Sequence, residues 1–102
     1  MEGHASISPD VLARYAADAA REVEGVRGLV ESHVPRHRAV RIAVAEDETV
    51  SVELHVALDW GAAFGEVGRG VQARVGDYLA RMARARPARV DVVVDEVGPV
   101  RA

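Results

Sequence analysis

The segment Val50–Leu58, with the sequence VSVELHVAL, limits the possible folds of this chain more than any other feature. Aliphatic residues occupy every second position, and smaller or polar residues fill the positions between them. Successive side chains of a β-strand point to opposite faces, so the pattern predicts a strand with one apolar and one mainly polar face. We expect this strand to be the centre of a small sheet, with helices on its apolar face and water or a partner on the other.

Three further segments are candidate strands. Aliphatic residues alternate in residues 40–44 and 90–97, and the last segment is expected to run parallel to the central strand because a helix separates the two. Residues 27–33 are also expected to form a strand, although Leu29 breaks the alternation. Residues 3–7 could add a strand at an edge.

The parity of the residue numbers determines the pairing register of the hairpin between residues 40–44 and 50–58. Both aliphatic rows must point to the same face, so the numbers of paired residues must sum to an even value. A loop formed by residues 46–48 meets this condition and pairs Val44 with Val50. It also places Arg41 opposite Glu53 on the outer face, which is an attractive cross-strand pair.

Two helices are predicted. The first begins at Ser8-Pro9, because serine caps free N–H groups and proline suits the first helical position, and it ends at Gly25. The second should run from about residue 62 to residue 84 or 86, where Pro87 would end it. Its apolar stripe consists of Phe64, Val67, Val71, Val75, Tyr78, Leu79 and Met82. This helix is rich in glycine; Gly68 would permit close approach to the sheet, and Gly65 and Gly76 could contact another chain.

Together these elements predict a two-layer α+β fold with a mixed sheet and both helices packed on one face. The 102 residues suggest a single domain over residues 1–102. The chain has no cysteine, which excludes disulfides and thiolate zinc sites, and a formal charge of −3 argues against general nucleic-acid binding. Neither a long apolar run nor a signal peptide is present, so we expect a cytoplasmic protein without direct membrane insertion.

Several of these features occur together in a known family. The first helix ends in glutamate-valine-x-glycine-valine at residues 22–26, and an aromatic-glycine turn, Trp60-Gly61, follows the long strand. The second helix contains Glu66-Val67, Val71-Gln72 and Val75, and a valine-rich strand comes last. Over nearly its whole length the chain resembles the alkaline shock protein family, the envelope stress response proteins of Gram-positive bacteria. Trp60 stands where a tyrosine is commoner.

The resemblance implies a non-enzymatic protein that acts by association. It implies a homo-oligomer, and some relatives gather at the inner face of the membrane through a small membrane-anchored partner. The family offers no catalytic residues and no cofactor to carry over. We therefore expect an envelope stress response or scaffold protein.

Two other sequence features could indicate ligands. His4, His33, His37 and His55 could suggest a metal site, but Pro35 separates His33 from His37 and makes a shared helix face unfavourable, so we expect no metal. Gly25-Val26-Arg27-Gly28 matches the GxxG loop of RNA-binding KH domains, although those loops join two helices and a helix cap followed by a tight turn is the simpler interpretation here. A small RNA-binding domain is therefore the alternative function.

Two groups of residues are candidates for partner binding. Trp60 and Phe64 are the only tryptophan and phenylalanine, and they could either fill the core under the end of the sheet or anchor a partner. The outer face of the sheet combines Arg41, Glu53, His55 and Val93 with two alanines and the charged residues Arg89 and Asp91. That mixture could face water or be buried against a second copy.

Overall fold

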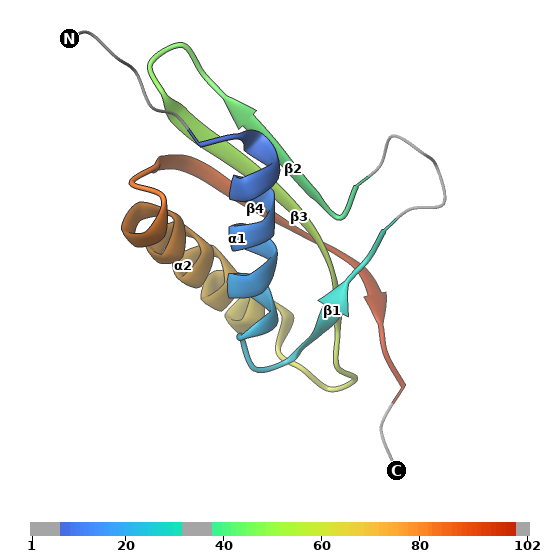
Figure 1. The fold of residues 1–102 in the computed structure, drawn as a ribbon. Helices are drawn as coiled ribbons and strands as arrows, with labels where there is room; N and C mark the ends of the chain where they lie inside the picture. The colour runs from blue at the N-terminus through green and yellow to red at the C-terminus, as the bar shows by residue number, and fades with distance from the viewer. Residues whose placement is uncertain (1–6, 32–37, 100–102) are drawn as a thin grey trace, which may run out of the picture.

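The computed structural model describes residues 7–31 and 38–99, and it places two helices on one face of a four-stranded sheet (Figure 1). The elements in chain order are α1 (Pro9–Arg21), β1 (Val26–Leu29), β2 (Val40–Val44), β3 (Thr49–Leu58), α2 (Phe64–Met82) and β4 (Arg86–Val97). The predicted two-layer α+β architecture is confirmed.

Strand β3 is the centre of the sheet, as predicted. Strand β4 runs parallel to it along one side, whereas β1 and β2 are both antiparallel to it on the other side. Strand β1 pairs with the last residues of β3 and β2 with the first, so the sheet is mixed. Val50, Val52, Leu54, Val56 and Leu58 are each at most 2% exposed. The alternation in this segment therefore does mark the face that forms the core.

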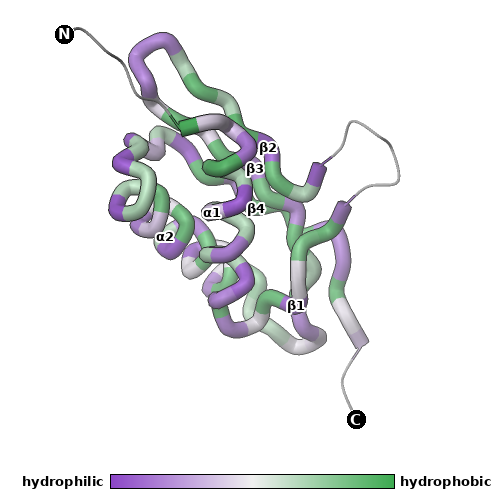
Figure 2. The backbone as a smooth tube through the Cα atoms, viewed as in Figure 1, coloured by the Kyte–Doolittle hydropathy of each residue, from purple (hydrophilic) through white to green (hydrophobic). Residues whose placement is uncertain are grey.

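The hairpin between β2 and β3 has the predicted register. Val44 pairs with Val50, and Arg41 lies opposite Glu53. The loop closes because Glu48 adopts a left-handed conformation with a φ of 69°. The Asp47 carboxylate accepts hydrogen bonds from the hydroxyl and the backbone N–H of Thr49, and these bonds lower the pKa of Asp47. Figure 2 shows hydrophilic residues at the hairpin tip, where Val44 is half exposed.

Helix α1 begins and packs as predicted. The Ser8 hydroxyl accepts a hydrogen bond from the Val11 N–H, and Pro9 is the first helical residue. The helix buries Leu12 and a row of four alanines, Ala16, Ala17, Ala19 and Ala20. Alanine side chains allow the helix backbone to lie close to its neighbours. Gly25 follows with a φ of 97°, the left-handed conformation that ends many helices.

Helix α2 is shorter than predicted. It ends at Met82, because Arg84 adopts a left-handed conformation and the N–H groups of Ala83 and Ala85 both donate to the Leu79 carbonyl. Pro87 does not end the helix; it lies within β4 and pairs with Val50. Four stripe residues, Val67, Val71, Val75 and Leu79, are buried. Phe64 and Met82, at the two ends of the helix, are exposed.

The glycines of α2 also differ from expectation. A Cβ added to Gly68 would meet no atom within 4 Å, so close packing on the sheet does not explain this glycine. Close approach occurs at Gly70 instead, where a Cβ would lie 3.3 Å from Cγ1 of Val23.

Some predicted features lie outside the described residues. They include most of the edge strand expected at residues 3–7 and the last residues of the strand expected over 27–33. Within the described part, β1 ends at Leu29, although the N–H of Val30 still donates to the His55 carbonyl.

The substitution Gly25→Ala should destabilise the fold by about 1–3 kcal/mol. Alanine is strained at a φ of 97°, and its Cβ would lie 2.8 Å from Cγ2 of Val67. Chemical denaturation measures the change. Gly28→Ala is the matched control, because a Cβ there meets nothing within 4 Å. Equal losses for the two variants would contradict the assigned role of Gly25.

The substitution Gly76→Ala should stabilise the protein by up to about 1 kcal/mol, since alanine is the better helix former. A Cβ at Gly76 meets no atom within 4 Å. Gly70→Ala, tested by the same thermal and chemical unfolding, should gain less because of its contact with Val23. A loss of stability in Gly76→Ala would show that this position packs against something.

Candidate functional site

The outer face of the sheet brings four of the six predicted partner-binding residues together. Strand β2 contributes Arg41, β3 contributes Glu53 and His55, and β4 contributes Val93. Arg41 is paired with Glu53 and Val93 with His55 in the sheet register. Paired residues point to the same face, so these side chains form one patch opposite the helices.

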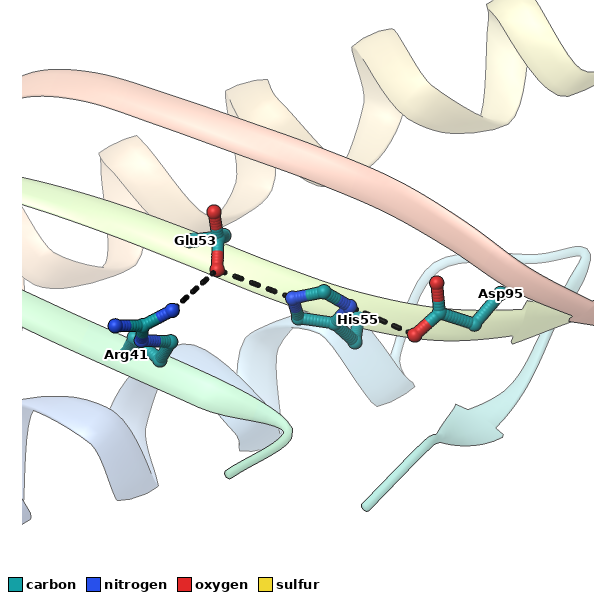
Figure 3. Close-up of polar contacts among 4 residues, drawn as sticks. All are labelled: Arg41, Glu53, His55 and Asp95. Carbon is teal, nitrogen blue, oxygen red and sulfur yellow. Dashed lines mark hydrogen bonds and ion pairs between the residues drawn. The ribbon is translucent and has the colours of Figure 1, made fainter. Parts of the chain in front are cut away.

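The polar side chains of this patch form a continuous row (Figure 3). Nδ1 of His55 lies 2.7 Å from Oδ2 of Asp95, and Nε2 of His55 lies 3.1 Å from Oε2 of Glu53. The same Glu53 oxygen lies 3.6 Å from Nη1 of Arg41. The His55 side chain is only 24% exposed, less than the other members of the row. We call Arg41, Glu53, His55 and Asp95 the polar row.

Asp95 alternates with the valines of β4, but nothing in the sequence predicted its bond to His55. The register between β3 and β4 shifts by one residue here. Val56 pairs with Val94 and Ala57 pairs with Glu96, so Asp95 has no partner on β3. A bulge of this kind leaves one residue unpaired and redirects its side chain. Bulges give no clear signal in a single sequence, which explains why this contact was missed.

The polar row favours the charged form of His55. A neutral imidazole can donate from only one ring nitrogen, whereas here a carboxylate faces each of them. The hydrogen bond to Glu53 raises the pKa of His55, and Asp95 raises it further, against the opposing effect of partial burial. Beside the row, Arg89 and Asp91 of β4 form their own ion pair at 2.8 Å.

Among the described residues, no three histidine, aspartate or glutamate side chains are placed so that they could hold one metal ion together. His4, His33 and His37 lie outside the described residues. The GxxG segment joins α1 to β1, and Gly25 adopts the left-handed conformation of a helix end, in agreement with the simpler interpretation. KH loops join two helices, so this segment does not have their setting.

Trp60 and Phe64 do not fill the core, and that interpretation was wrong. Trp60 lies in the turn after β3 and is 65% exposed, and Phe64 begins α2 and is 49% exposed. Helix α2 covers the sheet with Val67, Val71, Val75 and Leu79 instead, which leaves the aromatic pair outside the packed layer. The two aromatic residues therefore form a second candidate surface, at the end of β3 and away from the polar row.

A groove runs beside Trp60. It is lined by the end of α1, by the turn after β3 and by the start of α2. Three acidic residues, Glu24, Asp59 and Glu66, line it, and its lining contains no basic residue. Sequence reasoning missed this grouping, because Glu24 lies far from Asp59 and Glu66 in the chain and only the fold brings them together. We call this surface the Trp60 groove.

Comparison with known proteins identifies both a family and a fold. The model of the family of alkaline shock protein 23, described as having a cell envelope-related function, matches residues 1–99. No curated protein sequence matches the chain. The copper form of MamM CTD superimposes with a TM-score of 0.65 at 19% identity, covering 91% of this chain and 89% of that chain. A doubly substituted MamM CTD gives a TM-score of 0.63 at 18% identity, with 91% and 83% covered.

The superpositions show that the two proteins share a fold, and at identities this low they show the fold alone. The copper belongs to MamM CTD and carries no implication for this chain. Within residues 7–31 and 38–99, neither helix has the length and apolar character needed to cross a membrane.

The substitution His55→Gln should cost more stability at pH 6 than at pH 8.5, by less than about 1 kcal/mol. The pKa of His55 is raised in the folded state, so the stabilisation is fully present below the unfolded pKa and is lost as the pH rises through the folded pKa. The charged groups that share this face are Arg41, Glu53, Arg89, Asp91 and Asp95.

Urea denaturation of wild type and variant at both pH values gives the difference. The other histidines are common to both proteins, so their contributions cancel to first order. A difference that does not change with pH would contradict a charged His55.

Proposed function

Because the chain belongs to the family of alkaline shock protein 23, which has a cell envelope-related function, we propose that it is a non-enzymatic scaffold acting in the envelope stress response. In this proposal it works by self-association and by docking to a membrane-anchored partner. The family match also confirms the resemblance derived from the turn glycines and the valine-rich strands.

The observation that carries the self-association proposal is the open outer face of the β3–β4 pair. These two strands are parallel, and both helices lie on the opposite face (Figure 1). Parallel strands usually have both of their faces covered. Val93 lies in the open face beside His55, and the exposed Ala43 extends the apolar part of the surface. A second copy of the chain would supply the layer that this face lacks.

The charges of this face are compatible with burial. Arg41 and His55 both contact Glu53, and Arg89 contacts Asp91. Burying paired charges costs much less than burying a single unpaired charge. A flat surface of paired charges and small apolar side chains suits a protein interface better than it suits catalysis, which needs a nucleophile or base aimed at a bound substrate.

Membrane association through a partner is consistent with the charge of the chain. The protein has a formal charge of −3, and the cytoplasmic face of a membrane is negative. A protein of this charge is not attracted to that surface by itself. We therefore propose a cytoplasmic protein that a membrane-anchored partner holds at the inner face of the membrane.

Self-association is tested by light scattering or sedimentation over a range of protein concentrations. The wild-type chain should form species larger than the monomer. Val93→Glu should weaken association at least about tenfold, because it adds a negative charge between Asp91 and Asp95 in the open face.

Ala73→Glu is the matched control, since Ala73 is an exposed residue of α2 on the other layer. A strictly monomeric wild type at high concentration would contradict self-association. A Val93→Glu variant that associates as well as the wild type would exclude the outer face. Tight, strongly salt-dependent binding of RNA would instead support the RNA-binding alternative.

A further inference from the structure

We propose that the Trp60 groove binds a lysine- or arginine-rich segment of a protein partner. The inference deepens the proposed function and rests on it, since it identifies the surface and the chemistry by which the membrane-anchored partner would be recognised.

The fold holds the walls of the groove in fixed positions. The N–H of Asp59 donates to the Gly25 carbonyl at 2.8 Å, which ties the turn after β3 to the end of α1. The N–H of Ala62 donates to the Asp59 carbonyl at 3.0 Å and closes the turn itself. Gly25 and Gly61 both have positive φ angles, which gives the two connecting segments their sharp bends. The groove is therefore preorganised, and a ligand does not need to order it.

The groove has a uniform negative charge. Its acidic residues are Glu24, Asp59 and Glu66, and all three are exposed. Within the described part of the chain, none of the three forms an ion pair. Nearby Glu22, by contrast, is paired with Arg74. The carboxylates of the groove are thus available to a cation from outside the chain.

Trp60 adds a second means of recognition. Its side chain is 65% exposed, and it lines the same groove as the three carboxylates. The face of an indole ring attracts guanidinium and ammonium groups, and tryptophan is enriched among the residues that dominate interface energies. Val23 and Val67 line the groove as well and offer apolar contact to the long side-chain stems of arginine or lysine.

The start of α2 is the one local feature that would favour an anion. Ala63 provides no side-chain cap, so the first N–H groups of the helix leave a partial positive charge there. Glu66 lies in the first turn and offsets this charge. Two further full negative charges, on Glu24 and Asp59, then leave the groove with a preference for cations.

A membrane-anchored partner carries a segment of the required chemistry. The cytoplasmic flanks of membrane-spanning helices are enriched in lysine and arginine. Such a flank would otherwise lie against the negative lipid surface. Carboxylates fixed in a groove beside an aromatic ring can compete for it, and they would hold the scaffold close to the membrane.

Trp60 is the only tryptophan, so its fluorescence reports on the groove directly. The experiment titrates the 102-residue chain with a synthetic peptide of alternating arginine and leucine. A peptide with glutamate in place of arginine is the control. We expect the arginine peptide to change the intensity or wavelength of Trp60 emission in a saturable, salt-sensitive manner, and the glutamate peptide to have no effect.

The decisive variant combines Glu24→Gln, Asp59→Asn and Glu66→Gln, which keep the side-chain shapes and remove the charges. It should bind the arginine peptide at least about tenfold more weakly, because three exposed charge pairs are lost. The matched control combines Asp18→Asn, Glu31→Gln and Glu46→Gln, which remove the same net charge elsewhere, and it should bind within about twofold of the wild type. Circular dichroism establishes that both variants are folded.

Absence of binding by the wild type, or equal affinity for the wild type and the groove variant, would overturn the inference. The proposed function is tested by separate measurements. Light scattering reports on self-association, and the fraction of the protein that sediments with membranes from cells reports on membrane association. If the groove variant still sediments with membranes, the partner binds elsewhere and only the inference is lost. If the wild type neither associates nor reaches membranes, the proposed function itself is lost.

Discussion

Burial of the aliphatic row on β3 is the constraint on which the rest of the structure depends. Leu54 and Val56 are completely buried, and Val52 is nearly so. Side chains alternate along a strand, so a shift of the pairing by one residue would bring Glu53 and His55 into the core. An unpaired charge in a core is far costlier than an exposed valine. The same row therefore sets the hairpin register, the side on which both helices pack and the composition of the open face.

Features with a regular period were predictable from sequence. The alternation around Leu54, the parity of the β2–β3 hairpin and the cap at Ser8 each depend on neighbouring residues, and all three are present. The features that were missed depend on contacts between distant segments. The end of α2 was misplaced because the left-handed Arg84 turns the chain into β4, which already pairs with Thr49 at Arg86, before Pro87 is reached. The exposure of Trp60 depends on where α2 lies over the sheet, and the bulge at Asp95 leaves no trace in the pattern of valines.

The candidate site also has one part that could be predicted from sequence and one part that could not. Alternation placed Arg41, Glu53, His55 and Val93 on one face, because the register of the sheet follows from parity. The Trp60 groove required two connecting segments, after α1 and after β3, to meet, and residues far apart in the chain give no local signal of such a meeting. The aromatic pair was recognised as a candidate partner anchor, but its surroundings were not. Its acidic surroundings became visible once the turn after β3 was tied to the end of α1.

The electrostatics of the two surfaces suit them to different partners. Most charged side chains of the outer face form ion pairs within one chain. Two copies can therefore bring their outer faces together without placing strong like charges opposite each other. The Trp60 groove is the opposite case, because its carboxylates are unpaired within the described residues and two grooves would repel each other. Self-association at the groove is therefore disfavoured, and the groove remains open when copies assemble through the sheet. An assembly built in this way would present one acidic groove per copy, and a set of basic segments anchored in a membrane would bind it far more tightly than a single segment binds a single chain.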